Sequence, residues 1–493
     1  MYYKSTRDTE EKKYFSAQVI KQGLAEDGGL FVPTEIPTLD ENEIKTLTSL
    51  SYPERAAFVM GKFLTDFSYD ELIADCKAAY SEESFEGGAA PVVNVKDNIY
   101  SLELWHGPTA AFKDMALQLM PRLLVRSLQK TGEKRTSLIL VATSGDTGKA
   151  ALEGYKDIEG IKIMVFYPVD GVSRVQKLQM ATQSGNNVNV CAIKGNFDDA
   201  QNGVKKIFSD TDFTSELDKN GYFLSSANSI NWGRLAPQIV YYVSAYCDLL
   251  NQGKIAYGNK INVCVPTGNF GNILAAYIAK LMGLPIDKLI CASNVNNILT
   301  DFLRTGTYDR NRKFHVTMSP SMDILISSNL ERLLNFTAGA KITAECMQSL
   351  AKNGAYTVSP EILSKINESF VGYYADEKAT SEQIKKNFTK VGYLHDTHTA
   401  VAMSAAEQYI ADTNDKKPVV VASTASPYKF AADVLVSLGG KRPEDDLKAL
   451  DELSDLTKTA ITKPLRDIDK REVRFKSVID AVDMQGAVKE YIK

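Results

Sequence analysis

The chain has 493 residues, with 57 Lys and Arg against 61 Asp and Glu, which gives a formal net charge of −4. Hydrophobic residues make up 44% and charged residues 24%, values typical of a soluble globular protein. The charge balance lacks the basic excess of a nucleic-acid-binding protein, and no apolar run approaches the roughly 20 residues that a membrane-spanning helix needs. We therefore expect a soluble protein of two or three domains, with no nucleic-acid or membrane partner.

Residues 1–90 form the first predicted domain, which is small and mostly helical. Its first residues lead into charge rather than into the apolar segment of a secretory signal, so we expect a cytoplasmic protein. Asp27-Gly28-Gly29 is a turn signal before a short apolar strand at residues 31–33. The Gly and Ala residues before Pro91 mark the predicted boundary.

Residues 91–440 alternate short apolar, β-branched runs with amphipathic helical stretches. The predicted strands are residues 99–104, 138–143, 161–167, 188–193, 261–265, 289–293 and 418–423. Helical patterns include residues 172–182, 198–209 and 234–250. The strands lack polar alternation, which predicts parallel sheets covered by helices on both faces, an α/β fold.

Two later segments depart from this alternation. Residues 301–392 are predicted to form a helical insertion, with Ser359 as the N-cap of one helix and Thr380 at capping-box spacing from Gln383. Residues 441–493 are charged, and we expect them to form a helical extension that wraps the surface.

The cysteines and histidines favour no metal. The six cysteines contain no CxxC pair and are expected to be buried thiols in a reducing compartment. Only four histidines exist, and His395 with His398 alone is a weak zinc signal.

Ligands of an open parallel sheet bind beyond the carboxyl ends of its strands, so the loops that follow the strands matter most. After residues 99–104, Lys113 opens a helix in a mostly apolar loop. The positive end of a helix dipole disfavours a cation there and favours a neutral amine or an imine. The other interpretation is a solvated surface lysine.

The loop after residues 138–143 contains Ser144, Asp146 and Thr147. A P-loop is excluded, because Thr143 stands at the first glycine position and Ala150 stands where a hydroxyl must reach magnesium. The loop remains rich in hydroxyl groups at a helix start, so it can hold a carboxylate or a phosphate.

Two further loops complete the set. Gly268, Asn269, Phe270, Gly271 and Asn272 follow residues 261–265 and form a phosphate cradle of backbone N–H groups before a helix, although such loops are also common turns. Thr424 follows residues 418–423, where its hydroxyl can bind a heteroaromatic nitrogen or cap a helix. Together these loops supply an amine, a loop that can bind a carboxylate, a phosphate cradle and a lone hydroxyl. This combination predicts a site for pyridoxal 5′-phosphate.

At these residues the sequence resembles the threonine synthase family, within the tryptophan-synthase-β-like (fold type II) pyridoxal-phosphate enzymes. Three segments carry the resemblance: His106-Gly107-Pro108-Thr109 through Lys113-Asp114, residues 142–148, and Asn228-Ser229-Ile230-Asn231-Trp232 with Arg234. Residues 268–272, 319–332 and the N-terminal Ser5-Thr6-Arg7 are similar as well. The departures are Asp8, Thr397, Ser426 and Tyr428.

The resemblance implies conversion of O-phospho-L-homoserine and water to L-threonine and phosphate, by a lyase that is a monomer or a homodimer. Lys113 would hold the cofactor as an imine and then act as the general base. Residues 268–272 would bind the cofactor phosphate, and Thr424 would meet the ring nitrogen. Ser144, Asp146 and Thr147 are candidates for the substrate carboxylate or the cofactor 3′-oxygen.

For the substrate phosphate the resemblance offers Asn231, Arg234 and Arg174, although each Arg can equally form a salt bridge on a helix face.

Two alternative functions stay open. One is a pyridoxal-phosphate-dependent phospho-lyase or a serine/threonine dehydratase that releases 2-oxobutyrate, which Ser426 and Tyr428 motivate. The other is a non-catalytic nucleotide-binding protein that uses the loop at residues 144–149.

Overall fold

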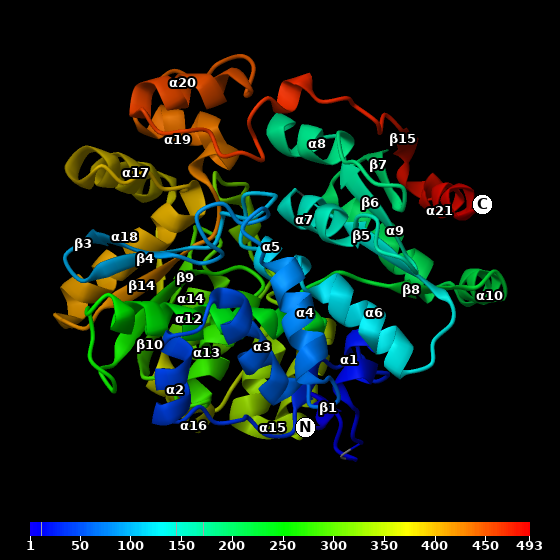
Figure 1. Ribbon diagram of the computed structural model, residues 1–493, viewed down its shortest axis with the longest axis horizontal. Helices are drawn as coiled ribbons and strands as arrows, with labels where there is room; N and C mark the ends of the chain where they lie inside the picture. The colour runs from blue at the N-terminus through cyan, green and yellow to red at the C-terminus, as the bar shows by residue number, and fades with distance from the viewer. Residues whose placement is uncertain (11, 144, 171) are drawn as a thin grey trace.

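Two mainly parallel β-sheets form the centre of the molecule (Figure 1). The computed structural model describes residues 1–493 except residues 11, 144 and 171. The larger sheet has the strand order β13 (Phe370–Tyr374), β10 (Ile286–Ser293), β9 (Ile261–Pro266), β14 (Val419–Ser423), β4 (Ile99–Glu103) and β3 (Val92–Lys96). All neighbours are parallel except β3 and β4. The smaller sheet has the order β15 (Val478–Asp480), β7 (Val188–Lys194), β6 (Ile161–Pro168), β5 (Thr136–Ala142) and β8 (Tyr222–Ser225), all parallel.

Helices cover both faces of each sheet, which explains the apolar strands. In β5, Leu138 and Leu140 pack with α9 (Phe197–Ser209), α10 (Thr211–Lys219) and α21 (Met484–Ile492). The alternate residues Ile139 and Val141 join the core on the side of α7 (Asp146–Tyr155). Figure 1 shows α7 and α8 (Arg174–Ala181) on one side of this sheet and α9 on the other. In the larger sheet, α18 (Thr397–Thr413) packs on one face, and α12 (Pro237–Asn251) and α13 (Gly271–Leu281) pack on the other.

All seven strands predicted in the core are present, within a few residues of their expected ends. The chain breaks between α5 (Asp114–Leu117) and α6 (Met120–Lys130), and Pro121 lies in the first turn of α6, where its missing N–H is tolerated. The stretch predicted at residues 234–250 is likewise divided, into α11 (Trp232–Leu235) and α12, at Pro237.

The N-terminal region packs against helices, among them α12, which covers one face of the larger sheet. It consists of a small antiparallel pair and four helices: β1 (Tyr3–Ser5), α1 (Ser16–Gln22), β2 (Phe31–Pro33), α2 (Glu41–Thr48), α3 (Tyr52–Phe63) and α4 (Tyr69–Ala79). Both α2 and α3 pack on α12. Trp232 of α11 inserts between Tyr3 and Phe63, with ring centroids 5.4 and 5.7 Å away.

The region expected to be a helical insertion contains strands as well as helices. Its helices are α14 (Ile298–Thr305), α15 (Leu330–Asn353), α16 (Pro360–Ser369) and α17 (Glu377–Val391). The strands β11 (Thr307–Asp309) and β12 (Ala355–Thr357) pair with each other, and β13 is the edge of the larger sheet. Ser359 caps α16 as predicted. The capping box at Thr380 is wrong, because Asp376 caps α17 and Thr380 lies inside that helix.

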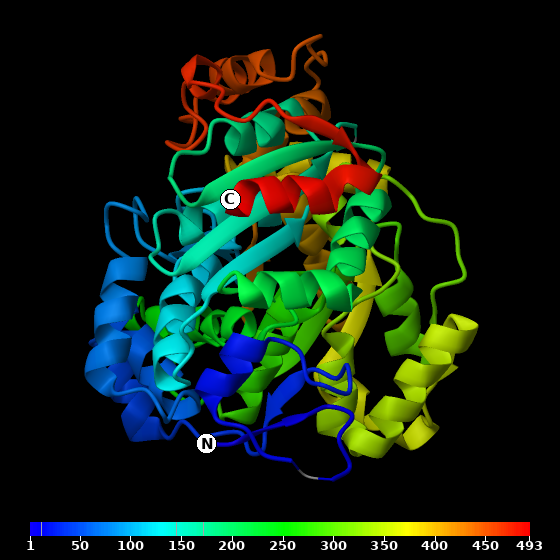
Figure 2. The same cartoon turned by 90° about the vertical axis from the view of Figure 1, so that its right-hand side faces the viewer.

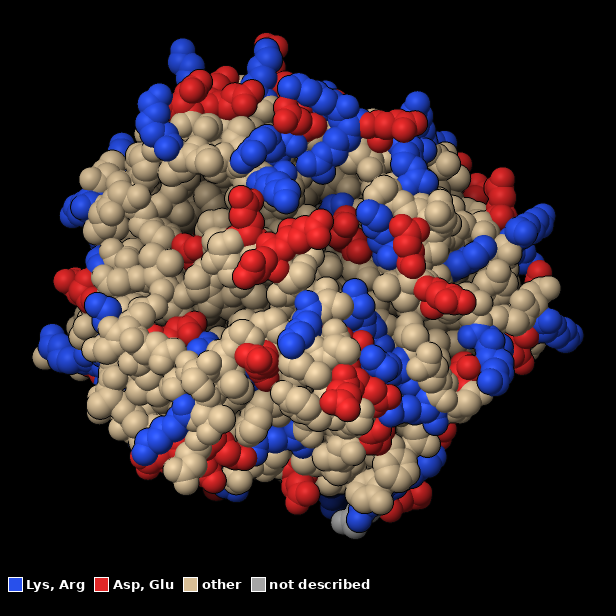
Figure 3. Space-filling model, in the orientation of Figure 1, with Lys and Arg blue, Asp and Glu red and all other residues tan. Residues whose placement is uncertain are grey.

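The C-terminal segment crosses from the larger sheet to the smaller one. After α19 (Ala431–Ser437) and α20 (Lys448–Thr457) the chain adds β15 to the edge of the smaller sheet and ends in α21, which lies across that sheet in Figure 2. Among the described residues, no helix is both long and apolar enough to cross a membrane. On the face shown in Figure 3, acidic and basic side chains are interspersed.

Candidate active site

The loops after β4 and β14 are joined to each other. The Phe112 N–H donates to the Thr424 carbonyl at 2.8 Å, and the Ser426 N–H donates to the Ala110 carbonyl at 3.1 Å. Lys113 is the residue that precedes α5, so these bonds fix its backbone next to Thr424. No described residue forms a hydrogen bond with the Thr424 hydroxyl, which leaves it available to a ligand.

The Lys113 amine lies in a nearly enclosed position, with 10% of its side chain exposed. Its Nζ is 3.5 Å from Asp146 Oδ2 and 3.4 Å from the Ser321 hydroxyl. Burial lowers the pKa of Lys113 below its ordinary value. Asp146 opposes this shift, whereas the charges of Lys429 and Arg234 add to it. The interpretation of Lys113 as a solvated surface residue therefore does not hold.

Asp146 begins α7 at the end of β5, and its carboxylate binds two ammonium groups. Lys429 Nζ is 2.7 Å from Asp146 Oδ1, and Gln176 Nε2 donates to the same oxygen at 2.9 Å. Burial alone would raise the pKa of Asp146, but Lys429 and then Lys113 outweigh it and hold the pKa well below its usual range. Asp146 is therefore a permanent anion in the site.

The rest of this loop depends on Gly145. Its φ is +151°, and a Cβ there would lie 2.4 Å from Gln176 Nε2, so only glycine allows Gln176 to approach Asp146. Thr147 is half-buried in the first turn of α7, and its hydroxyl has no partner among the described residues. Ser144, which we also predict to bind substrate, lies outside the described residues.

Residues 268–272 form a cradle at the start of α13. Phe270 has the left-handed φ of +61°, which turns the chain into the helix. Among the described residues, none accepts a hydrogen bond from the backbone N–H groups of residues 269–272. A Cβ on Gly268 would lie 2.5 Å from the Ser321 carbonyl oxygen, so this close approach also requires glycine.

Asn272 contributes a side-chain donor to the cradle. Its Oδ1 accepts a hydrogen bond from the Tyr242 hydroxyl, which fixes the amide. Its Nδ2 is buried and has no partner among the described residues. A buried donor without an acceptor is costly, so this atom indicates that an anion belongs there.

Ser321 connects the lysine to the cradle. Its hydroxyl contacts Lys113 while its carbonyl lies against Gly268. The Ser321 N–H donates to His398 Nε2 at 3.1 Å, and His398 Nδ1 is 3.0 Å from Asp396 Oδ1. The lysine and the cradle, predicted independently, are thus brought together through one residue.

The candidates for the substrate phosphate fall into different environments. Arg234 is buried, and Nη1 donates to the Ala227 carbonyl at 2.5 Å; burial lowers its pKa to about 10. It has no carboxylate partner among the described residues. Asn231 caps α11 and donates to the Ile20 carbonyl at 2.9 Å, so its amide already has protein partners. Arg174 is exposed and pairs with Asp445 at 3.0 Å.

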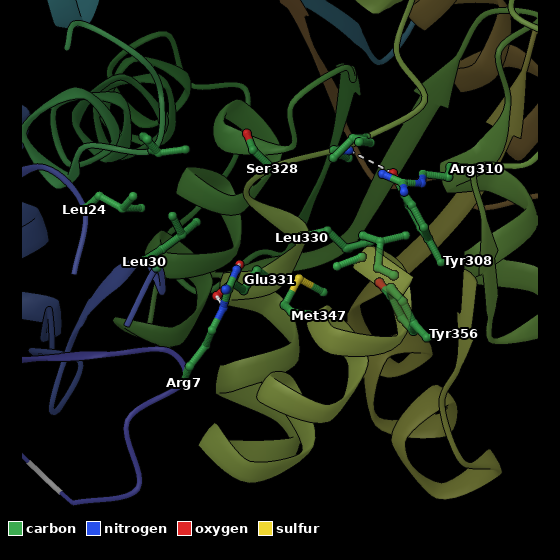
Figure 4. Close-up of a pocket in the computed structure, with 16 residues that line it drawn as sticks. Arg7, Leu24, Leu30, Tyr308, Arg310, Ser328, Leu330, Glu331, Met347 and Tyr356 are labelled. Carbon is green, nitrogen blue, oxygen red and sulfur yellow. Dashed lines mark hydrogen bonds and ion pairs between the residues drawn. The ribbon is translucent and has the colours of Figure 1, made fainter. Parts of the chain in front are cut away.

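The cradle is held by the segment that leads into α15. The Ser327 hydroxyl donates to the Gly268 carbonyl at 2.7 Å, and Asn329 Nδ2 donates to the Asn269 carbonyl at 2.9 Å. Beyond them lies a cavity of about 350 Å³ (Figure 4). At its floor Arg7 and Glu331 point toward each other, with two bonds of 2.8 Å. This pair ties the N-terminal region to α15, the helix that follows the segment holding the cradle.

Comparisons with known proteins agree with this geometry. Three family models match: "Threonine synthase N terminus" over residues 2–80, "Pyridoxal-phosphate dependent enzyme" over residues 89–425 and "Threonine synthase, C-terminal" over residues 399–492. Threonine synthase of Saccharomyces cerevisiae is 38% identical over 466 residues, which cover 89% of each chain. The chain belongs to the threonine synthase family of pyridoxal-phosphate-dependent enzymes.

Other similar proteins lie in the same family. Threonine synthase-like 1 of Homo sapiens is 43% identical over 447 residues, but the match spans 87% of this chain and only 59% of that relative. The crystal structure of pyridoxal-phosphate-bound threonine synthase from Brucella melitensis has a TM-score of 0.89 at 36% identity, with complete coverage of both chains. The predicted α/β fold and fold-type II architecture are therefore confirmed.

Pyridoxal phosphate is the cofactor of this threonine synthase family member, and the site fits it. The unpartnered Asn272 Nδ2 and the free N–H groups at residues 269–272 suit the cofactor phosphate. Thr424 offers a hydroxyl for the ring nitrogen, and Lys113 offers an amine of lowered pKa. These roles follow from the chemistry of the donors.

Several residues of the site were not predicted from the sequence, namely Lys429, Gln176, Ser321 and His398. Lys429 had a usable signal, since it is a lysine in an apolar loop after a buried parallel strand, as Lys113 is.

Ser426 and Tyr428, which depart from the family pattern, direct their hydroxyls to the segment at residues 459–462. Tyr428 donates to the Thr459 carbonyl at 2.7 Å, and the Ser426 hydroxyl lies 3.3 Å from that of Thr462.

Proposed function

We propose that this protein is a threonine synthase that converts O-phospho-L-homoserine and water to L-threonine and phosphate. The observation that carries the proposal is the joint placement of Lys113, Thr424 and the cradle at residues 268–272 around one site. A conserved fold alone would not specify a reaction, whereas this set of donors suits a phosphorylated pyridine aldehyde and an amino-acid substrate.

The bound cofactor supplies an electron sink for the electrons released at the substrate Cα. Lys113 acts as the general base, because burial lowers the pKa of its amine and so increases the neutral fraction above that of an ordinary lysine at the same pH. It removes the Cα proton and then a Cβ proton, and phosphate leaves from Cγ. Cγ is then protonated, the hydroxyl of water adds at Cβ while its remaining proton passes to the released phosphate, and a proton returns to Cα.

The substrate itself needs two anion sites. Arg234, a buried guanidinium without a carboxylate partner among the described residues, binds the substrate phosphate. Asn231 holds the start of α11, on which Arg234 lies, and so positions that side chain. Thr147, in the first turn of α7, offers its hydroxyl to the substrate carboxylate, and we assign the same role to Ser144 from the sequence alone.

The alternative reaction is release of 2-oxobutyrate by a phospho-lyase or dehydratase of the same cofactor class. The relatives named threonine synthase-like 1, at 43% identity, keep this alternative open. Ser426 and Tyr428 do not support it, because both hydroxyls are engaged with the segment at residues 459–462.

The deciding experiment incubates the protein with pyridoxal phosphate and O-phospho-L-homoserine and measures amino acids and phosphate. We expect threonine and phosphate in equal amounts; 2-oxobutyrate without threonine would favour the alternative. Borohydride reduction followed by peptide mass spectrometry should place the cofactor on Lys113. A Lys113→Ala variant should lose turnover, whereas the exposed-lysine control Lys134→Ala should keep it.

A further inference from the structure

A second lysine lies in the site, more deeply buried than the first. The Lys429 side chain is 0% exposed, and its Nζ lies 2.7 Å from Asp146 Oδ1 and 3.0 Å from the Thr109 carbonyl. A buried ammonium needs a partner, and here both acceptors are short and direct. Because it has no exposed surface and two protein acceptors, Lys429 is poorly placed to bind substrate itself.

The two lysines compete for one carboxylate. Lys429 holds the short contact with Asp146, while Lys113 Nζ stays 3.5 Å from the other oxygen. Gln176 occupies Asp146 Oδ1 together with Lys429, which fixes the carboxylate plane. Among the described residues, Lys113 makes no shorter contact with an acid.

The pair also crosses between the two sheets. Asp146 follows β5 of the smaller sheet, and Lys429 lies in the loop after β14 of the larger sheet. Thr109, the second acceptor, is in the loop that carries Lys113. One ammonium therefore fixes the position of the carboxylate relative to the catalytic amine.

We propose that Lys429 is a positioning residue for Lys113: it engages Asp146 in the tight ion pair and so leaves the catalytic amine without one. The proposal rests on the role of Lys113 in the proposed function, but it concerns the free amine of the cofactor-free protein. Lys429 acts through Asp146, because the contacts of its Nζ are with Asp146 and the Thr109 carbonyl.

The direction of the effect follows from the charges that face Lys113. Among the described residues these are Asp146 from α7, Lys429 from the loop after β14 and Arg234 from α11. His398 of α18 contacts Ser321 and Asp396 rather than Lys113. Removing Lys429 deletes a neighbouring positive charge and frees Asp146 to attract Lys113. Both changes favour the protonated amine, so the pKa of Lys113 must rise.

The test measures the titration of Lys113 in the full-length protein freed of cofactor. Trace acetylation with acetic anhydride over a pH series, followed by peptide mass spectrometry, gives the midpoint for each lysine. We expect Lys429→Met and Lys429→Gln to raise the Lys113 midpoint by about one pH unit, which lowers its reactivity at neutral pH about tenfold. Lys429→Arg keeps the charge and should restore the wild-type midpoint.

Lys149→Met is the matched control. Like Lys429, Lys149 is a buried lysine. It lies in α7, its side chain is 8% exposed, and its Nζ is 2.9 Å from Glu153 Oε2. Its loss costs a buried ion pair but should leave the Lys113 midpoint unchanged. Two results would overturn the proposal. The Lys113 midpoint in the folded Lys429→Met or Lys429→Gln protein could equal that of the wild type, or Lys149→Met could raise this midpoint by the same amount. Neither readout depends on threonine formation, so this result and that of the turnover assay are separable.

Discussion

The Asn272 amide offers a direct test of the cradle, because its free donor points to a ligand rather than to the protein. In Asn272→Ala the cofactor phosphate loses one donor. A hydrogen bond to a charged group contributes about 1.5 to 3 kcal/mol, which corresponds to a roughly 10- to 150-fold weaker affinity for pyridoxal phosphate. Asn272→Asp should bind still more weakly, because a carboxylate would face the phosphate.

The stability of the cofactor-free protein should change much less. Asn272→Ala removes a buried donor without a partner, which is favourable, but it also leaves the Tyr242 hydroxyl without its acceptor, which is unfavourable by about the same 1 to 3 kcal/mol. We therefore expect the free energy of unfolding to shift by no more than about 1 kcal/mol. A purely structural role predicts the reverse, a large loss of stability with little effect on affinity.

Equilibrium dialysis of pyridoxal phosphate against the cofactor-free protein measures the affinity, and urea unfolding measures the stability. Tyr242→Phe is the control, because it removes the hydroxyl bound to Asn272 and leaves the amide donor in place. It should weaken cofactor binding far less than Asn272→Ala. Equal affinities of wild type and Asn272→Ala would refute the assignment of the cradle to the cofactor phosphate.

Three further variants test the supports of the site. Gly145→Ala places a methyl group against Gln176 at a φ of +151°, and we expect it to lose about 2 kcal/mol of unfolding free energy in urea. Glu331→Gln breaks the pair with the partly exposed Arg7 and should cost about 2 kcal/mol and weaken cofactor binding. Burial lowers the pKa of His395 to about 4, so its protonation favours the unfolded chain. Stability should therefore fall as pH drops from 6.5 through 4, by about 3 kcal/mol in all, and His395→Phe should abolish that part of the loss.

Each of these variants has a contrasting control. Gly160 has a positive φ of +76°, but a Cβ there would meet no other atom within 4 Å. The additional loss of unfolding free energy in Gly145→Ala, compared with Gly160→Ala, therefore measures the contact with Gln176. Glu26→Gln breaks the exposed pair with Lys12 and should leave the unfolding free energy essentially unchanged. An unfolding free energy of His395→Phe that depended on pH as steeply as that of the wild type would contradict the argument for His395.

The sequence predicts the central strands well because a strand buried on both faces must be apolar at every position. Leu138 and Ile139 pack against helices on opposite faces of the sheet, so both are hydrophobic. The sequence of β5 is therefore an unbroken run of apolar residues from Leu138 to Ala142. The strands that were missed are short edges such as β8, β13 and β15. An edge strand such as β15 is partly exposed, with Val478 and Asp480 on the surface, and carries no such run.

The site was predictable only where one loop suffices. Lys113 and the cradle each have a local signature, a lysine at a helix start and glycines before a helix. The partners of Asp146 come from three separate segments, and nothing in the residues around Gln176 or Lys429 specifies that they meet. Such contacts depend on how the two sheets pack together, which local patterns do not encode.

The charges of the site agree with ligands that are strongly anionic. Lys113 and Lys429 lie against the Asp146 carboxylate, and Arg234 adds a further positive charge near Lys113. Burial is the main cause of the lowered pKa of Lys113, and the charges of Lys429 and Arg234 lower it further because like charges repel. A cofactor phosphate, a substrate phosphate and a substrate carboxylate would relieve that repulsion. The positive charges near Lys113 therefore have two effects. They add to the lowering of its pKa, and they favour binding of two phosphorylated ligands, the cofactor and the proposed substrate.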